Sequence, residues 1–339
     1  MRAYVGSFTS AGGRGVLAAD VDTQTGALHI TGASDAVTDP SYLTLAGGTL
    51  YAVSETDEGA AAAFDVTGAA PRPLGAPVPV GGAGPTHLCV ASGHLLTANY
   101  SSGSVSVLAL SEDGPPHAAV GLARHEGLGP VTDRQSAPHA HQVLPDPSGR
   151  WVTAVDLGTD SVRVYAVDAT TGALRLHGET ALRPGTGPRH LAFHPAGTHA
   201  YVLNELEPTL TVCRWDAAAG VLLPLGETPV LPEDATRPSY PSAVVVAPDG
   251  RFVWAAVRGD DSLAVLALDE SGEKAALVTT VPCGGHWPRD LALDPTGRRL
   301  YAANERSGDV TWFDIDRGTG VPHRAGAVEA PAATCVTFG

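Results

Sequence analysis

Four residues whose side chains can move protons or stabilise negative charge stand at related positions in the sequence. They are His141, Arg189, Glu205 and Arg258. An imidazole or a carboxylate can take a proton from water during a reaction. Guanidinium groups pair with carboxylate or phosphate at two points and can stabilise an oxyanion. Such a set suits acid–base chemistry on an anionic ligand, provided that the fold brings these distant residues together.

A repeated phrase supplies the elements that must position them. It consists of a proline, a short apolar run, a turn with glycine, a second apolar run and then Asn or Asp. The clearest copies are Pro188–Glu205, Pro241–Arg258 and Pro288–Glu305, with a fourth at Ala140–Leu157. The seven anchor residues, about 43 to 55 residues apart, are Pro40, Pro85, Ala140, Pro188, Pro241, Pro288 and Pro331. This period is typical of propeller blades with four strands, at ~40–50 residues each.

Each copy consists of short runs rich in β-branched and aromatic residues, bounded by turn residues, and no stretch predicts an amphipathic helix. Asp22–Leu28 and Asp168–Leu174 are expected to be hairpins between the outer strands of a blade. The chain begins with a second strand (MRAYVGSF) and ends with a first strand (ATCVTFG), which together complete one blade. We therefore predict an all-β fold, a single seven-bladed propeller over residues 1–339, with antiparallel four-stranded blades and a ring closed by both termini.

Composition excludes several classes of partner. The net charge of −15 argues against nucleic acid and anionic membranes, which both select basic surfaces. No apolar run approaches the ~20 residues of a membrane span, and no basic-then-apolar leader opens the chain. The four cysteines are scattered without a Cys-x-x-Cys pair, as expected for buried thiols in a reducing compartment. We therefore expect a cytoplasmic protein.

Aligned copies of the repeat turn the fold into a prediction of the site. Inner strands of the blades line a central channel, so equivalent positions form rings around one axis. The ring just after the anchors is Ser41, Thr86, His141, Arg189, Ser242, Arg289 and Ala332. A ring with a purely structural role would be expected to hold small, similar residues. His141, Arg189 and Arg289 depart from this pattern. A second ring, at the end of the second strands, is Ser7, Ser54, Asn99, Asp156, Asn204, Val257 and Asn304, and Glu205 and Arg258 directly follow it.

Polar residues that converge on one mouth of the channel predict a small-molecule site. We expect the catalytic residues to be His141, Arg189, Glu205 and Arg258. The predicted substrate-binding residues are His87, Asn99, Tyr100, His139, Asp156, Asn204, Arg289 and Asn304. An Asn at the end of a strand can equally be a turn former that bonds its own backbone. The histidines His87, His139 and His141 have no carboxylates at matching positions, so no metal or other cofactor is predicted.

The chain resembles the lactonase family of seven-bladed propellers, which includes bacterial 6-phosphogluconolactonases and fungal 3-carboxy-cis,cis-muconate lactonizing enzymes. The resemblance spans the whole chain, and its most specific parts are GPRH (Gly187–His190), NEL (Asn204–Leu206) and PHAHQVLPDPSGR (Pro138–Arg150). The family's proposed His, two Arg and Glu correspond by motif to His141, Arg189, Arg258 and Glu205. In the fifth copy, Val257 replaces the Asn that the family usually has before the arginine.

This resemblance implies a hydrolase in carbohydrate metabolism that opens a phosphorylated or carboxylated sugar lactone such as 6-phosphogluconolactone. Arg189 and Arg258 would hold the anionic group or stabilise the oxyanion, and His141 or Glu205 would activate water. Two alternatives remain open at this point: a muconate-type cycloisomerase and a non-catalytic ligand-binding propeller. The expected partner is a small anionic lactone or dicarboxylate, bound by a monomer or weak dimer, with selectivity set by loops 117–135 and 231–240.

Overall fold

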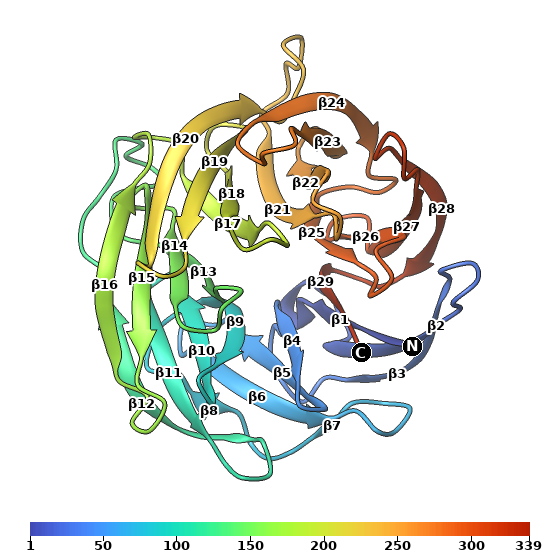
Figure 1. Cartoon of the computed structure of the whole chain (residues 1–339). Helices are drawn as coiled ribbons and strands as arrows, with labels where there is room; N and C mark the ends of the chain where they lie inside the picture. The colour runs from blue at the N-terminus through green and yellow to red at the C-terminus, as the bar shows by residue number, and fades with distance from the viewer.

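Short strands dominate the computed structural model, which describes residues 1–339. The only helical element is a single 3₁₀ turn at Thr9–Ala11. Seven antiparallel sheets stand around a central axis, and the chain passes through them in order around the ring (Figure 1). Each sheet is one blade of the predicted propeller, so the predicted fold class is confirmed.

The blades are numbered from the one that holds the N-terminus. Blade 1 contains β29 (Ala333–Phe338), β1 (Arg2–Ser7), β2 (Val16–Val21) and β3 (Leu28–Ser34). Blade 2 contains β4 (Leu43–Ala46), β5 (Thr49–Ser54), β6 (Ala60–Asp65), β7 (Arg72–Pro73) and β8 (Val78–Pro79). Blade 3 contains β9 (Pro85–Ala91), β10 (His94–Asn99), β11 (Ser104–Leu110) and β12 (Pro116–Arg124).

The remaining blades have four strands each. Blade 4 contains β13 (Ala140–Pro145), β14 (Val152–Asp156), β15 (Ser161–Val167) and β16 (Leu174–Ala181). Blade 5 contains β17 (Pro188–Phe193), β18 (His199–Asn204), β19 (Thr209–Asp216) and β20 (Val221–Pro229). Blade 6 contains β21 (Tyr240–Val246), β22 (Phe252–Arg258), β23 (Ser262–Leu268) and β24 (Ala275–Pro282). Blade 7 contains β25 (Pro288–Leu293), β26 (Arg299–Asn304), β27 (Asp309–Ile315) and β28 (Pro322–Glu329).

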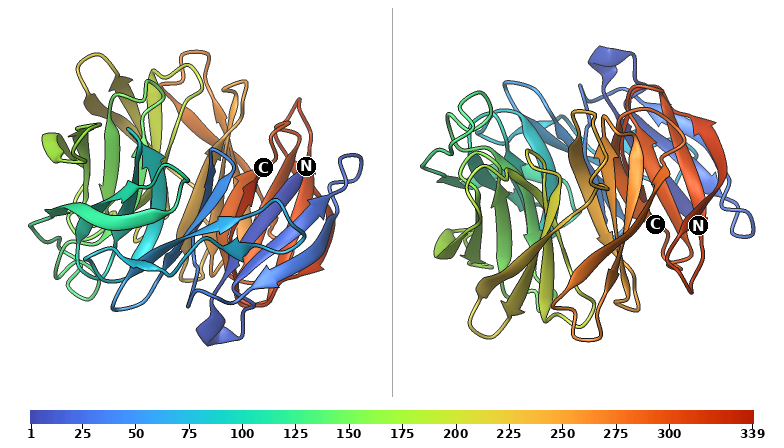
Figure 2. Two further views of the ribbon diagram at one scale, coloured as in Figure 1. Left: turned by 90° about the horizontal axis from the view of Figure 1, so that it is seen from below. Right: turned by 90° about the horizontal axis from the view of Figure 1, so that it is seen from above.

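Both ends of the chain meet in blade 1. Strand β1 pairs with β2 on one side and with the C-terminal strand β29 on the other, as in Val5 opposite Val336. The termini lie next to each other in both edge-on views (Figure 2). The predicted closure is therefore confirmed, and the ring has no open gap between its first and last blades. The two predicted hairpins, β2–β3 and β15–β16, also form.

Hydrophobic clusters fill the spaces between neighbouring blades. In one of them, Trp254 of blade 6 packs with Leu291 and Phe313 of blade 7. The middle strands are buried on both faces, as along β22, because each lies between two other blades. The outermost strands alternate between exposed and partly buried residues, as along β16, because they have one free face. Polar residues buried near the axis are therefore exceptions to an apolar interior.

One shared backbone hydrogen bond corrects the predicted alignment of the last copy. The residue before the anchor accepts a bond from the residue that follows the second strand, as in Glu205 N–H to Gly187 O at 2.7 Å. In blade 1 the acceptor is Ala332, bonded by the Phe8 amide at 3.1 Å. The anchor is therefore Ala333 and not Pro331, which lies in the turn before β29 and imitates the proline of the other copies. Thr334, and not Ala332, occupies the ring position of Arg189.

No helix of the structure is long and apolar enough to cross a membrane. All four cysteines are free and buried, as predicted.

Candidate active site at one mouth of the channel

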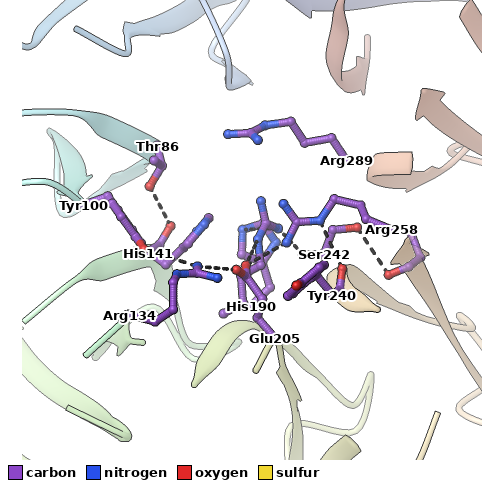
Figure 3. A network of polar contacts seen from close by, with 12 residues as sticks. Thr86, Tyr100, Arg134, His141, His190, Glu205, Tyr240, Ser242, Arg258 and Arg289 are labelled. Atoms are coloured by element: carbon purple, nitrogen blue, oxygen red, sulfur yellow. Dashed lines mark hydrogen bonds and ion pairs between the residues drawn. The ribbon is translucent and has the colours of Figure 1, made fainter. Parts of the chain in front are cut away.

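Antiparallel pairing explains why the predicted residues meet. An inner strand begins at the same face of the ring at which the second strand of its blade ends. Arg189 is the second residue of β17, Glu205 directly follows β18, and Arg258 is the last residue of β22. Figure 3 shows Glu205 and Arg258 pointing toward a common centre at this mouth, and Arg189 Nε lies 3.2 Å from Glu205 Oε2.

The Glu205 carboxylate is the hub of this cluster. Its Oε2 atom lies 2.7 Å from Arg258 Nη2 and 3.2 Å from Arg189 Nε, and its Oε1 atom accepts a bond from Arg134 Nη2 at 2.6 Å. Glu205, Arg189 and Arg258 are all at least nine-tenths buried. One carboxylate thus pairs with three guanidinium groups: Arg134 and Arg258 donate charge-assisted hydrogen bonds to it, and Arg189 lies within ion-pair distance.

Electrostatics fix the protonation of the hub. Burial alone would raise the pKa of Glu205, but Arg258, Arg189 and Arg134 outweigh burial and lower that pKa to about 2. Burial and the neighbouring Arg258 lower the pKa of Arg189 to about 9. At neutral pH the carboxylate is therefore ionised and Arg189 stays charged, so the cluster carries an excess of positive charge.

His141 lies beside this cluster on β13. Its side chain is buried, its Nδ1 atom has no hydrogen-bond partner, and its ring lies 5.4 Å from Tyr100 and 5.3 Å from His190 between centroids. Burial, followed by repulsion from Arg189, lowers the pKa of His141 well below the ordinary value. The imidazole is therefore neutral at neutral pH and has an unused ring nitrogen.

Two more arginines border the mouth. Arg134 belongs to the loop between β12 and β13, and its side chain is 36% exposed. Arg289 on β25 forms two ion pairs: its Nη2 atom lies 3.4 Å from Glu55 Oε1, and its Nη1 atom lies 3.3 Å from Glu305 Oε2. Its guanidinium also lies over the Phe8 ring. Arg289 therefore lies at the mouth already paired with two carboxylates, and its role in substrate binding stays a prediction.

Sequence reasoning missed Arg134 and His190. Arg134 lies outside the repeat, in the loop predicted only to shape selectivity, so alignment of the copies could not select it. The longest spacing between anchors, from Pro85 to Ala140, was the available signal for an added structure at this place. His190 follows Arg189 within the GPRH motif, and its Nε2 atom lies 3.4 Å from Arg189 Nη1.

His190 and His87 form part of a layer of rings that crosses the channel. The His87 ring lies 4.0 Å from the Tyr42 ring and 5.4 Å from the His190 ring, which in turn contacts His141. Tyr42, His87 and His190 come from blades 2, 3 and 5, so the contacts run across the axis. His87 also lines the cavity on the far side of this layer. It therefore lies deeper in the channel than a substrate-binding residue at the mouth would.

Tyr100 and His139 stand at the mouth. Their rings stack with centroids 4.4 Å apart, and the Tyr100 hydroxyl lies 3.5 Å from Arg134 Nη2. Both side chains are half-buried and remain candidates for contact with a ligand.

Four other predicted substrate-binding residues lie inside the blades instead. Asn99, Asn204, Asn304 and Asp156 are each 0% exposed. The Asn204 amide donates to Thr209 and Thr211, both at 2.9 Å, which ties the second strand to the third. Because these side chains are inaccessible and serve their own blades, we leave all four out of the site.

The largest cavity lies at the opposite end of the channel. It measures about 540 Å³, has no charged lining residue, and is bounded by the far ends of the inner strands, including Leu144, Phe193 and Thr337. The charged mouth is chemically better suited to an anionic ligand than this cavity, which no charged residue lines. No group of three or more His, Cys, Asp or Glu residues is placed to hold a metal ion.

Comparison with known proteins agrees with this architecture. The model of the family "Lactonase, 7-bladed beta-propeller" matches residues 2–338. The 6-phosphogluconolactonase of Bacillus subtilis (strain 168) is 35% identical over 342 residues, which cover 99% of this chain and 97% of the relative. A 6-phosphogluconolactonase of Formosa agariphila is 30% identical, with 94% of this chain and 93% of the relative covered.

Solved structures superpose closely over nearly the whole chain. A protein from Lactobacillus plantarum has a TM-score of 0.94 at 29% identity, with 99% of this chain and 98% of that chain covered. The periplasmic gluconolactonase of Pseudomonas aeruginosa has a TM-score of 0.91 at 27% identity and the same coverage. Taken together with the match over residues 2–338, these likenesses show that the chain belongs to the lactonase family of seven-bladed β-propellers.

Proposed function

We propose that this protein is a lactone hydrolase of the 6-phosphogluconolactonase type. The observation that carries the proposal is the cluster at the mouth, where the buried Glu205 pairs with two buried arginines and the partly exposed Arg134 beside a neutral His141. The names of the relatives from Bacillus subtilis and Formosa agariphila point to the same activity.

The arginines suit the charge of such a substrate and of its transition state. Arg134, Arg189 and Arg258 share a single carboxylate, so the cluster retains unneutralised positive charge. A phosphate or carboxylate pairs with guanidinium groups at two points, and donors aimed at a developing oxyanion lower the barrier to acyl transfer. We assign Arg189 and Arg258 to the anionic group or the oxyanion of the lactone.

His141 is the preferred general base. In the proposed reaction, the imidazole takes a proton from water as the water oxygen attacks the lactone carbonyl carbon. The ring ester C–O bond then breaks, and the departing oxygen takes that proton and becomes a hydroxyl group. Because the ester is part of a ring, this hydroxyl and the new carboxylic acid belong to one ring-opened product, whose carboxyl group ionises at neutral pH and releases one proton per turnover.

Glu205 is better suited to positioning than to proton transfer. Both of its oxygens already accept from arginines, whereas Nδ1 of His141 has no partner. We therefore favour His141 over Glu205 as the group that activates water. The role of Glu205 is to hold the guanidinium groups in place before the substrate arrives.

The relatives also bear on the earlier alternatives. The names of the relatives favour lactone hydrolysis over a muconate-type cycloisomerase or a binding-only propeller. A small anionic lactone is the proposed partner. A monomeric or weakly dimeric state and a cytoplasmic location stay predictions of the sequence.

The proposal is tested with a panel of lactones. Hydrolysis of each lactone is measured as the fall in pH of a weakly buffered solution. We expect rapid turnover of 6-phosphogluconolactone, slower turnover of uncharged gluconolactone, and no reaction with 3-carboxy-cis,cis-muconate. The same solution without protein serves as the control for spontaneous hydrolysis. If no lactone of the panel releases acid faster than in this control, the proposal is wrong.

A further inference from the structure

One backbone position at the mouth recurs in the left-handed conformation. It is the residue directly before the anchor, whose carbonyl accepts the hydrogen bond from the end of the second strand. Five copies have a positive φ there: Asp39 (48°), Gly84 (58°), Gly187 (58°), Trp287 (64°) and Ala332 (52°). Glycine adopts this conformation readily, whereas a bulky side chain with positive φ is an outlier.

Trp287 is the bulkiest residue at this position, and its surroundings hold it there. Its amide N–H donates to Asp261 Oδ1 at 2.8 Å, and its carbonyl accepts from the Glu305 amide at 3.1 Å. Since Gly84 and Gly187 serve the same backbone position in other blades, the fold itself requires no side chain here. Unfavourable backbone conformations that the surroundings maintain cluster at functional sites, which motivates a search for what the indole does.

The indole lies against Arg258, a member of the Glu205 cluster. The Arg258 guanidinium carbon is 5.6 Å from the centroid of the Trp287 ring, within the range of a cation–π contact. Arg306 lies over the same ring at 3.4 Å, and the Tyr240 ring is 6.1 Å away. Arg258 Nε also donates to the Tyr240 carbonyl at 3.0 Å. Trp287 is therefore the aromatic contact of an arginine that is otherwise fixed by polar groups.

We propose that Trp287 is a positioning residue: its indole fixes the orientation of Arg258 and thereby sets the affinity of the mouth for the anionic group of the substrate. This inference rests on the proposed function. Without the indole, Arg258 would keep its charge and its 2.7 Å contact with Glu205, but it would lose one of the surfaces that restrict the guanidinium. Binding of the anion should therefore weaken more than the chemical step.

Three variants separate this role from a structural one. Trp287→Gly removes the indole and leaves a residue that suits the backbone. Trp287→Phe keeps an aromatic ring. Ala332→Gly makes the same backbone change in blade 1, where no aromatic side chain is lost. All three should give the wild-type circular dichroism spectrum.

We expect Trp287→Gly to raise KM for 6-phosphogluconolactone by about 5- to 30-fold, the range for loss of one cation–π contact, and to change kcat by less than about threefold. Trp287→Phe should recover most of the affinity, and Ala332→Gly should match wild type. An unchanged KM in Trp287→Gly, or a loss confined to kcat that phenylalanine does not recover, would overturn the inference.

Failure of the proposed function would give a different result, namely a wild-type protein that hydrolyses no lactone. The inference is then tested by calorimetric titration of the same variants with 6-phosphogluconate. Weaker binding to Trp287→Gly alone would support it. Equal binding by wild type and Trp287→Gly, or no binding by wild type, would overturn it.

Discussion

Two buried ion-pair clusters of this propeller invite comparison. One surrounds Glu205 at the mouth of the channel, and the other joins Asp156 of blade 4 to His125, which directly follows β12 of blade 3; Nδ1 of this histidine lies 2.5 Å from the carboxylate. Both contain an almost inaccessible carboxylate paired with a cationic or titratable partner. Burial and charge alone therefore do not distinguish a reactive site from a structural one.

The difference lies in the polar atoms that are left without partners. Asp156 also accepts from the backbone amides of His139, Gly158 and Thr159 at 2.8–3.1 Å, which completes its hydrogen bonding. In the mouth cluster, His141 Nδ1 has no partner, and Arg189 Nε lies near Glu205 without the geometry of a hydrogen bond. Buried polar groups that lack partners are uncommon in folded proteins, and a ligand at the mouth would complete those of His141 and Arg189. Asn204 Oδ1 and Asn304 Oδ1 are also unpartnered, but both side chains are fully inaccessible to a ligand.

The largest expected effect concerns stability. Asp156→Ala should lower the free energy of unfolding by about 3–5 kcal/mol, because it removes one member of a buried pair and the acceptor of three backbone amides. Urea denaturation measures this loss. Turnover per folded molecule should stay within about threefold of wild type, and a selective loss of activity would return Asp156 to the site.

Arg189→Ala should have the opposite profile. We expect kcat/KM for 6-phosphogluconolactone to fall by at least ~10²-fold, the size of effect seen when an oxyanion donor is removed. Initial rates at neutral pH measure this. Arg189→Lys is the matched control, since it keeps the charge and loses the planar fork, and it should be intermediate. Wild-type turnover in Arg189→Ala would exclude this residue from the mechanism.

Arg134 tests how far the reactive cluster extends toward solvent. Because its side chain is 36% exposed, Arg134→Ala should raise KM by only about 3- to 10-fold, as expected for a partly solvated charge. Steady-state kinetics at two salt concentrations measure this effect, which should shrink at high salt. An effect as large as that of Arg189→Ala would move Arg134 into the catalytic centre.

The smallest expected effects are displacements along the pH axis. The pKa of His141 lies well below the ordinary histidine value of about 6.5. His141 should therefore become protonated, and activity should be lost, only at a pH below that value. Glu205, with a pKa of about 2, stays ionised throughout. The acid limb of kcat/KM against pH should therefore lie below pH 6.5. A midpoint at or above 6.5 would contradict a neutral, desolvated His141.

Asp156 provides the parallel measurement for stability. Burial raises the pKa of Asp156, but the His125 hydrogen bond and charge, together with backbone bonds, lower it below the ordinary value of 3.8. Because the folded-state pKa is depressed, this stabilisation is present above the unfolded-state pKa and is lost as pH falls through the folded-state value. Stability curves of wild type and Asp156→Ala should therefore converge below about pH 4. A gap that stays constant there would contradict the ionised pair.

The repeat accounts for what the sequence could predict. Seven copies with complementary ends lead to the ring and its closure, and the residues that break the ring pattern, His141 and Arg189, converge with Glu205 and Arg258 in the structure. Position in the repeat says where a strand ends but not which way its last side chain points. Asn204 was therefore assigned to the mouth although it bonds within its own blade.

Two further misses have equally local causes. Arg134 lies outside the repeated phrase, in the connection between β12 and β13, so comparison of copies could not place it. In the last copy, Pro331 imitated an anchor that is in fact Ala333, because a proline in the preceding turn looks the same in sequence. The pairing of backbone strands, which the sequence does not show, decides how the copies of the repeat align and which way the side chains at the strand ends point.

The most direct test compares the two buried histidines, one from each cluster. We predict that His141→Ala lowers kcat/KM for 6-phosphogluconolactone by at least ~10²-fold with little change in stability, as expected for loss of one acid–base group. His125→Ala should lower stability and leave kcat/KM per folded molecule within about threefold of wild type. Unchanged turnover in His141→Ala, or an equal loss in both variants, would contradict the assignment of chemistry to the mouth of the channel.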